Sequence, residues 1–396
     1  MLDKVREPGS SFHTRESLTV CLVSETFPPE TNGVAMTLGR LADGLVDAGH
    51  AVQLITPFRR DRSIAAYPRV KARYVAGMPI PGYTSMRMGF PAGGAMAALW
   101  RREHLPDVLY VATQGLLGLS ALKEAQRRRI PVVSGFHTNF QQYSKHYRVG
   151  WLEPAITRYF RYFHNRTAAT LVPTESQAAV VRRFGITNPR TLGRGVDADL
   201  FHPCKRSEDL RRALGFDPQD PLLLYVGRLA GEKNIDLAVR AAQRARETAP
   251  RARLVLVGDG PDGARLEREY PDLIFYGERH GEALAQIYAS GDVFVFPSAS
   301  ETFGNVTLEA MASGLPVVVF DYAAARIAVR TGENGIAVPL GREDAFVDEV
   351  VKLAADSNLR HRLGASARIT AEKFRWQAIV AEFETQLREA MSVQTQ

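Results

Sequence analysis

The chain of 396 residues contains only two cysteines, Cys21 and Cys204, which lie far apart and without partners at metal-ligand spacing. This scarcity excludes a disulfide framework and a cysteine-based zinc site, and it is typical of a reducing compartment. No run of about 18 apolar residues occurs, so we expect no membrane-spanning helix. The polar, charged N-terminus argues against a secretory signal peptide. We therefore expect a cytoplasmic protein.

Repeats and low-complexity segments are also missing, and the composition, 45% hydrophobic and 23% charged, is that of a globular protein long enough for two domains. The charge is unevenly spread. Residues 1–200 hold 26 Lys and Arg against 15 Asp and Glu, a net of +11, whereas the remainder holds 24 against 28, a net of −4. A basic first half indicates an anionic partner, which leaves open a phosphorylated substrate, an anionic membrane surface or nucleic acid.

Short apolar segments alternate with amphipathic helical patterns along both halves of the chain. This rhythm predicts an α/β protein with parallel sheets and helices on both faces of each sheet. We expect two doubly wound, Rossmann-like domains, joined near residues 195–208, that hold a ligand in a cleft between them. Strands are predicted at 17–25, 51–57, 107–113, 130–137, 221–229, 253–260, 273–279, 292–298 and 315–321, and helices at 34–49, 118–129 and 234–249.

Two literal motifs carry little weight. Residues 258–263 read GDGPDG, a dinucleotide fingerprint between a strand and a helix, but Asp259 and Pro261 crowd the turn that would approach a pyrophosphate. Asp197 and Asp199 form a D-x-D pattern of the kind that metal-dependent sugar transferases use. They lie in the connector between the two halves, where a turn or cap role is more in keeping. No bound metal is predicted.

A phosphate site is better supported. The segment VGRLAGEKN places Arg228 and Lys233 just past a strand end, where both can converge on one diphosphate. In SASETFGNVTLEAMASGLPVV, residues 298–318, Gly304 lets the backbone come close to a ligand and Asn305 can cap a helix that begins near Val306. The free N–H groups and the dipole of that helix end favour a diphosphate.

Two glutamates flank this loop. Glu309 lies about one turn inside the helix, and Glu301 stands ahead of the loop. Carboxylates repel phosphate, so each is expected to face hydroxyl donors, one from a ribose and the other from a sugar. A diphosphate with a polyhydroxyl group at each end is a nucleotide sugar.

The chain resembles retaining glycosyltransferases of the GT-B fold in glycosyltransferase family 4, and the resemblance covers nearly its whole length. Its specific part is the pattern of Glu301 and Glu309, eight residues apart. The supporting segments are FPPETNGVAMTLGRLADGL, FHTNF, LVPTES, GRGVD, GRLAGEKN, LVGDGP, FPSASETFGNVTLEAMASGLPVV and NGIAVP. The IPGY and FHTNFQQYSKHY segments are similar to those of bacterial enzymes that glycosylate diacylglycerol. Close relatives of this kind are also read as GDP-mannose-dependent α-mannosyltransferases.

The resemblance implies a role for each matching residue. Glu301 would bind hydroxyls of the donor sugar, Glu309 the ribose, and Arg228 and Lys233 the leaving diphosphate. His137 would lie near the reacting sugar. The backbone of Phe303, Gly304 and Asn305 would meet sugar and phosphates, Gly33 would approach the phosphates from the other domain, and Tyr276 and Gly277 would line the base pocket.

The resemblance also implies an arrangement and a mechanism. Residues 1–200 would form the acceptor-binding domain, completed by a last helix at about 376–396, and residues 201–375 the nucleotide-sugar-binding domain. Transfer would be a front-face displacement in which side chains replace a metal, so no cofactor is expected besides the nucleotide-sugar substrate. His137 or a donor phosphate oxygen would take the acceptor's proton.

The acceptor and the donor are less strongly encoded. Residues 78–94 and the helical pattern at 151–166 mix apolar and basic side chains, which suits either an anionic membrane surface or a packed helix with a basic outer face. We favour a lipid acceptor such as diacylglycerol, met by a peripheral enzyme at the cytoplasmic face of the membrane. UDP-glucose, UDP-glucuronic acid and GDP-mannose all stay open as donors. The alternative function is a GDP-mannose-dependent α-mannosyltransferase that acts on another lipid or glycan acceptor.

Two alternatives belong to other classes of protein. One is a nucleotide-sugar epimerase, which needs no acceptor. The other is a non-catalytic binding protein for nucleotide sugars or nucleic acid. The complete set of Arg228, Lys233, Glu301 and Glu309 argues against a non-catalytic role, and the basic half lacks the aromatic-interleaved motifs of RNA-binding sheets. No nucleic-acid partner is expected.

Overall fold

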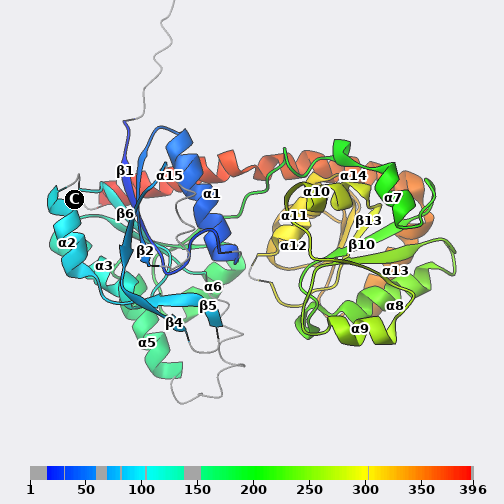
Figure 1. Ribbon diagram of the computed structural model, residues 1–396, viewed down its shortest axis with the longest axis horizontal. Helices are drawn as coiled ribbons and strands as arrows, with labels where there is room; N and C mark the ends of the chain where they lie inside the picture. Colours follow the sequence, from blue (N-terminus) through cyan, green and yellow to red (C-terminus); the bar gives the residue numbers. More distant parts are fainter. Residues whose placement is uncertain are drawn as a thin grey trace, which may run out of the picture.

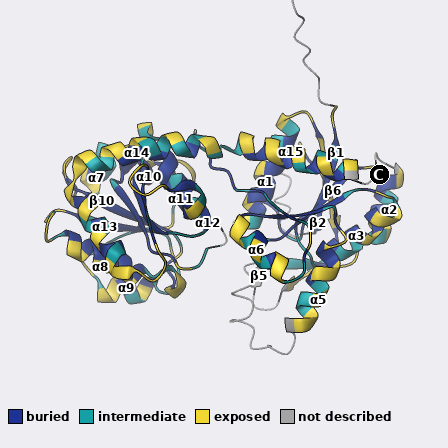
Figure 2. Cartoon of the chain, turned by 180° about the vertical axis from the view of Figure 1, so that it is seen from behind, coloured by how far each residue is buried: buried dark blue, intermediate teal, exposed yellow. Residues whose placement is uncertain are grey.

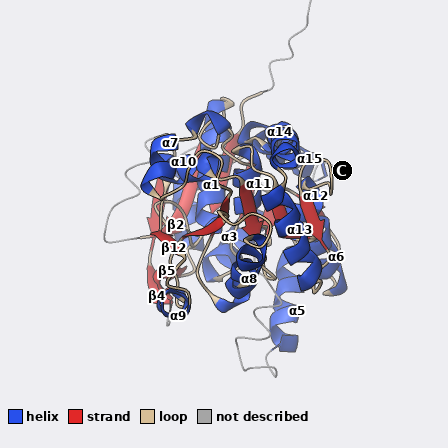
Figure 3. Cartoon of the chain, turned by 90° about the vertical axis from the view of Figure 1, so that its right-hand side faces the viewer, coloured by secondary structure: helices blue, strands red, loops and turns tan. Residues whose placement is uncertain are grey.

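The computed structural model shows two lobes side by side, each built on a parallel β-sheet (Figure 1). The predicted α/β class is confirmed, and the strands lie inside layers of helices (Figure 3). The structure describes residues 16–30, 32–58, 69–80, 83–102, 105–137, 153–301 and 303–393.

The N-terminal lobe contains a seven-stranded sheet in the order β3-β2-β1-β6-β7-β8-β9, all parallel. Its strands are β1 (Thr19–Val23), β2 (Ala51–Pro57), β3 (Lys71–Val75), β6 (Val108–Val111), β7 (Val132–Gly135), β8 (Ala169–Val172) and β9 (Pro189–Thr191). The helices are α1 (Gly33–Asp47), α2 (Gly93–Arg102), α3 (Leu116–Arg127), α5 (Glu153–His164) and α6 (Glu175–Arg183).

Both faces of this sheet are apolar, because alternate residues of each strand point to opposite sides. In β1, Val20 and Leu22 join a core that α1 completes, whereas Cys21 and Val23 join a second core under α2 and α3. All four residues are fully buried. Strands that are buried on both faces read as unbroken apolar runs, which explains why the sequence located them.

The C-terminal lobe repeats the plan with a six-stranded parallel sheet in the order β12-β11-β10-β13-β14-β15. Its strands are β10 (Leu222–Val226), β11 (Arg253–Val257), β12 (Ile274–Gly277), β13 (Val293–Phe296), β14 (Val317–Phe320) and β15 (Ile336–Val338). The helices are α7 (Glu208–Ala213), α8 (Ile235–Ala245), α9 (Gly263–Glu269), α10 (Gly281–Ser290), α11 (Asn305–Ala312), α12 (Ala323–Ala328), α13 (Glu343–Ala355) and α14 (Ser357–Ala371), with short 3-10 turns η3 (Pro203–Lys205), η4 (Gly231–Lys233) and η5 (Glu372–Phe374). Figure 2 shows the strands as the buried centre of each lobe.

Two segments connect the lobes, and they run side by side. The first follows β9 and the second follows η5; Val196 and Arg375 form a parallel bridge between them. Gly195 makes this approach possible, because a Cβ there would stand 2.6 Å from the ring of Trp376. The second segment leads into α15 (Trp376–Val393), which returns to the N-terminal lobe and adds Phe383 to its core.

Two features of the N-terminal lobe bear on the acceptor. Strands β4 (Gly77–Ile80) and β5 (Tyr83–Gly89) pair antiparallel, which the sequence did not indicate. The helix expected near 151–166 is α5, and it packs Phe160 and Phe163 inward while Arg158 and Arg161 are exposed. None of the helices in the described part of the chain is long and apolar enough to cross a membrane.

Candidate active site

The C-terminal sheet reverses its strand order between β10 and β13, and the candidate donor residues gather at this point. The loop after β10 leads through Arg228 into η4, which ends at Lys233. The loop after β13 carries Ser298 and Glu301. Ligands of doubly wound sheets bind at the carboxyl ends of the strands where the order reverses. The fold therefore places both segments where a ligand binds.

Lys233 and Glu301 form an ion pair at this switch point. The Lys233 Nζ donates to Glu301 Oε1, and also to the carbonyl of Ser300 at 3.2 Å. The Ser298 hydroxyl donates to the same Glu301 oxygen at 2.9 Å. The side chains of Lys233 and Glu301 are only 14% and 17% exposed. Lys233, which was expected to bind phosphate, and Glu301, which was expected to bind a sugar, thus lie together and are largely shielded from solvent.

Arg228 takes a different position from Lys233. Its side chain is 63% exposed, and its guanidinium lies 4.0 Å from Glu232. Arg228 and Lys233 flank the same short turn, but in this structure their charges do not point to one place. A diphosphate between them would have to draw the Arg228 side chain in.

The loop ahead of α11 differs in one detail from the expectation. Asn305 is the first residue of α11 and does not cap it; the cap position is Gly304, with φ of +88° and no side-chain hydrogen bond. The left-handed conformation favours glycine there and leaves the first N–H groups of α11 without a side-chain cap. Phe303 is 4% exposed, and its carbonyl accepts from the N–H of Ala324 at 2.7 Å, which anchors the loop.

Glu309 lies behind this loop and has a partner that the sequence did not indicate. The hydroxyl of Tyr288, on α10, donates to Glu309 Oε2 at 3.0 Å. Burial raises the pKa of Glu309 to about 7, and the Tyr288 hydrogen bond opposes the rise. The carboxyl therefore titrates near neutral pH, and a ligand with hydroxyl donors would favour its ionised form.

Three glycines with positive φ stand in a row at the carboxyl edge of β10, β11 and β12: Gly227, Gly258 and Gly277. A Cβ on Gly258 would stand 2.0 Å from the carbonyl oxygen of Gly227. The GDGPDG segment thus packs its backbone against the Arg228 loop, a structural role that explains its glycines. Tyr276 lies beside this row and stacks with Arg279, whose guanidinium is 4.3 Å from the ring centre.

A second cluster lies at the carboxyl edge of the N-terminal sheet. Asn32 caps α1 by accepting from the N–H groups of Val34 and Ala35, so Gly33 is the first helical residue. A Cβ on Gly33 would meet nothing within 4 Å, so this position is open. Its carbonyl accepts from Arg194 at 2.8 Å.

His137 belongs to this second cluster. Its Nε2 lies 3.0 Å from the Tyr110 hydroxyl, and its Nδ1 has no hydrogen-bond partner among the residues that the structure describes. Burial, together with the nearby Arg194 and His164, lowers the pKa of His137 to about 3. The imidazole is therefore neutral near pH 7 and is a weak base.

The sequence analysis missed the residues that hold these side chains in place. Tyr288 and Tyr110 read as ordinary core aromatics, and no local pattern relates them to Glu309 or His137. Arg194 could have been found, because it lies in the GRGVD segment that carries the family resemblance. The two aspartates that follow it serve the connector: Asp197 accepts from the N–H of Leu200 and pairs with Arg40 at 2.9 Å.

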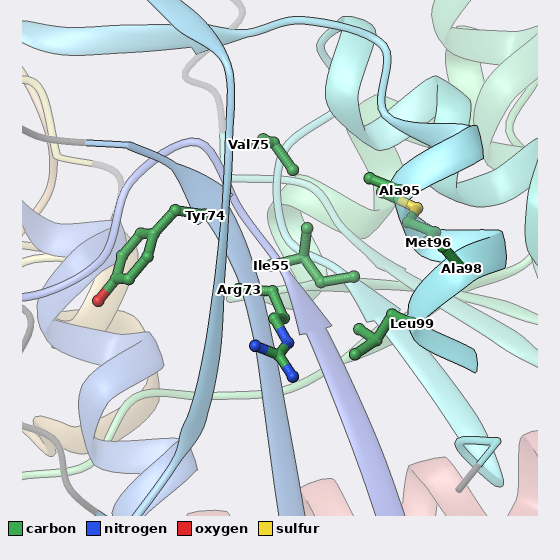
Figure 4. Close-up of a pocket in the computed structure, with 8 residues that line it drawn as sticks. All are labelled: Ile55, Arg73, Tyr74, Val75, Ala95, Met96, Ala98 and Leu99. Carbon is green, nitrogen blue, oxygen red and sulfur yellow. The ribbon is translucent and has the colours of Figure 1, made fainter. Parts of the chain in front are cut away.

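A groove of about 240 Å³ opens elsewhere in the N-terminal lobe, between the edge strand β3 and helix α2 (Figure 4). Its lining is largely apolar. Ile55 and Met96 are almost fully buried, whereas Arg73 and Tyr74 on β3 are exposed. No residue of the donor cluster lines it.

Comparisons with known proteins agree with this architecture. Residues 31–200 match the model "Glycosyltransferase Family 4", and residues 206–370 match "Glycosyl transferases group 1". A GDP-mannose-dependent alpha-mannosyltransferase of Mycobacterium tuberculosis is 34% identical over 368 residues, 92% of this chain and 94% of that protein. An alpha-monoglucosyldiacylglycerol synthase of Streptococcus pneumoniae is 26% identical over 314 residues, 76% of this chain and 70% of that protein.

A solved structure shows the same fold. Sucrose-phosphate synthase of Thermosynechococcus elongatus superimposes with a TM-score of 0.75 at 22% identity, covering 95% of this chain and 100% of that one. Two Rossmann-like lobes, with the candidate donor residues at a switch point, are the architecture of a GT-B glycosyltransferase. The chain belongs to glycosyltransferase family 4, and it is a hexosyltransferase that uses a nucleotide sugar.

Proposed function

We propose that this protein transfers a hexose from a nucleotide-diphosphate sugar, GDP-mannose in the first place, to a hydroxyl of a membrane lipid such as diacylglycerol. Transfer retains the anomeric configuration and needs no metal ion. The observation that carries the proposal is the shielded Lys233–Glu301 pair at the switch point of the C-terminal sheet. GDP-mannose comes first because the mycobacterial relative is named for it.

The donor would lie across the two sides of the switch point. Lys233 and the open N-terminus of α11 would face the diphosphate, with Arg228 drawn in from solvent. Glu301 would exchange Lys233 for sugar hydroxyls, and Glu309 would accept from the ribose. Lys233, Arg228 and the N-terminus of α11 would stabilise the negative charge that grows on the leaving diphosphate, the largest contribution that such a site makes to catalysis.

The reaction exchanges one C–O bond for another on the same face of the sugar. The bond between the anomeric carbon and the diphosphate oxygen breaks, and its electron pair leaves with the nucleoside diphosphate. The acceptor oxygen then bonds to that carbon and gives its proton to a leaving phosphate oxygen. His137, with its pKa lowered to about 3, is a poor base for this proton. We assign it instead to a hydrogen bond with the sugar, through Nδ1, which has no partner among the described residues.

Two observations support a lipid acceptor. The pneumococcal relative is named for a diacylglycerol glycolipid. The groove between β3 and α2 offers apolar walls to an acyl chain, and Arg73 at its mouth offers a positive charge to an anionic membrane surface (Figure 4). The enzyme would then work as a peripheral protein at the cytoplasmic face of the membrane.

The first experiment incubates the purified protein with GDP-mannose, UDP-glucose or UDP-glucuronic acid, with and without diacylglycerol, in EDTA. Mass spectrometry detects new glycolipid, and released nucleotide is measured in parallel. We expect mannosyl-diacylglycerol in EDTA from the wild-type protein, and about 100- to 1000-fold less from Lys233→Ala. Glycolipid that forms from a UDP-sugar and not from GDP-mannose would show that the donor is the UDP-sugar. A new nucleotide sugar without acceptor indicates an epimerase and contradicts the proposal.

The groove has its own test. Ala98 lines it and Ala97 does not. Ala98→Phe is expected to raise the KM for long-chain diacylglycerol about tenfold while leaving the KM for a short-chain, water-soluble analogue unchanged, because one buried alkyl segment of two CH₂ groups is worth about that factor. Ala97→Phe, the same change one residue earlier on α2, is the control. Equal effects on both acceptors would exclude the groove as the acyl-chain site.

A further inference from the structure

Glu25 is a carboxylate at the switch point of the N-terminal sheet that the reaction described above does not use. It lies two residues beyond β1, and its N–H donates to the hydroxyl of Thr113 at 3.0 Å. Thr113 lies two residues beyond β6, the neighbour of β1 across the reversal of strand order. Glu25 therefore stands at the carboxyl edge of the sheet, where a doubly wound domain binds its ligand.

One oxygen of this carboxylate has no hydrogen-bond partner among the residues that the structure describes. Glu25 Oε1 is buried and makes no hydrogen bond with any residue in the described part of the chain. Gly115 lies against it, because a Cβ at position 115 would stand 2.2 Å from Oε1. A glycine thus leaves room for the carboxylate at a place where its oxygen lacks a donor. Buried polar atoms without partners are rare and costly, and a ligand that supplies a hydroxyl removes this cost.

The surroundings of Glu25 favour an uncharged hydrogen-bond donor, such as a hydroxyl group, as its partner. Among the residues that the structure describes, Tyr159 of α5 is a titratable side chain near Glu25, and its hydroxyl already donates to the carbonyl of Gln114 at 2.6 Å. Burial raises the pKa of Glu25 to about 7, against backbone hydrogen bonds from Gly89 and Leu117. Within the described residues, no group of three or more acidic, histidine or cysteine side chains gathers there to hold a metal ion.

We propose that Glu25 accepts a hydrogen bond from a hydroxyl of the acceptor headgroup and so holds the acceptor at the switch point of the N-terminal lobe. This inference rests on the proposed function, since it assigns the acceptor side of the same reaction. Glu25 contacts the substrate but does not take the transferred proton, which goes to the leaving phosphate.

The test compares wild-type protein with Glu25→Gln, which keeps the shape of the side chain and removes its charge. We expect the KM for diacylglycerol to rise about ten- to a hundredfold, and the KM for the nucleotide sugar and acceptor-free nucleotide release to stay within twofold. In the wild-type protein the acceptor KM should fall as pH rises through about 7, because the ionised carboxylate is the better acceptor. The variant should lose this dependence.

Gly115→Ala is a second variant, because its Cβ would displace the Glu25 oxygen without changing any charge. It should show the same rise in acceptor KM. Glu124→Gln is the matched control: Glu124 is another buried carboxylate of this lobe, paired with Arg127 and Arg128. We expect it to lower the Tm and leave the acceptor KM unchanged.

Calorimetric binding of diacylglycerol micelles separates this inference from the proposed reaction. If Glu25→Gln binds diacylglycerol as tightly as the wild-type protein does, the role of Glu25 is overturned and the proposed reaction is not. Binding without glycolipid formation overturns the reaction alone. No binding by the wild-type protein overturns both. An equal rise in acceptor KM for Glu25→Gln and Glu124→Gln assigns the effect to stability and also overturns the proposal.

Discussion

At the scale of single residues, the candidate site contains two carboxylates in different surroundings. Glu309 is held by Tyr288 behind the α11 loop, and Glu301 is held by Lys233 and Ser298 ahead of it. The first has no cation, and burial raises its pKa to about 7. Glu301 accepts a hydrogen bond from Ser298 and is paired with the positive charge of Lys233. The two acids of one motif thus have different partners.

We predict a pH-dependent effect of Glu309→Gln on stability. A carboxyl whose pKa is raised by folding from 4.5 to about 7 binds protons more tightly in the folded state. Its stabilising contribution is complete below the unfolded pKa and is lost as pH rises through about 7, by about 3 kcal/mol at most. The variant, which has no such proton to lose, should therefore be the more stable protein above pH 7.

Urea unfolding at pH 5 and at pH 8.5 measures this difference. The same substitution at the exposed Glu333 is the control and should leave the pH dependence as it is. Equal pH dependence in the wild-type protein and Glu309→Gln would contradict the assigned pKa.

At the scale of elements, the loop ahead of α11 depends on the conformation of its backbone. Gly304 takes φ of +88°, and an alanine in this conformation costs roughly 1–2 kcal/mol. We predict that Gly304→Ala lowers the affinity for the nucleotide sugar about tenfold, because the loop must change the direction of its N–H groups to relieve the strain. Isothermal calorimetry with the donor measures the loss.

Gly341 supplies a matched control, since it has φ of +84° in the turn after the edge strand β15 and open space around its Cβ position. Gly341→Ala should cost similar stability and leave donor affinity unchanged. If both variants bind the donor as the wild-type protein does, the conformation of the loop is not what presents the phosphate site.

At the scale of the whole molecule, the lobes are joined by two adjacent connecting segments, and the second leads into α15 on the N-terminal lobe. Gly195→Ala would force a methyl group against Trp376 and push the connectors apart, at about 1–3 kcal/mol for such overpacking. We predict a lower Tm and a lower kcat with little change in donor affinity, because most of the candidate donor residues lie in the C-terminal lobe, whereas the proposed transfer needs both lobes.

Gly193→Ala changes the same connector two residues earlier, where the nearest atom is Ile379 Cδ1 at 3.8 Å, an ordinary contact. It should behave like the wild-type protein. Scanning calorimetry, donor titration and turnover on the three proteins make the comparison. A fall in donor affinity with Gly195→Ala would show that the connectors shape the donor site itself.

The sequence by itself indicated two parallel sheets and nine of the thirteen strands that the structure describes in them, whereas β3, β8, β9 and β15 were not predicted. Strands such as β1 and β10 are apolar on both faces, and the helices between them carry one apolar stripe, so local patterns were enough. Arg228, Lys233, Glu301 and Glu309 could be named for a similar reason: each lies a few residues beyond a strand end or inside the helix that follows, where loops meet ligands.

Only the tertiary structure decided which side chains meet. Tyr288 and Glu309 are 21 residues apart, Gly33 and Arg194 are 161 apart, and no local pattern links them. The structure also made Gly304 rather than Asn305 the cap of α11, because backbone conformation there depends on the anchored loop. The contact between Gly115 and the Glu25 oxygen, which has no partner among the described residues, could likewise be seen only in the structure. Pair contacts across a sheet edge depend on strand order, which the periodicity of a sequence does not encode.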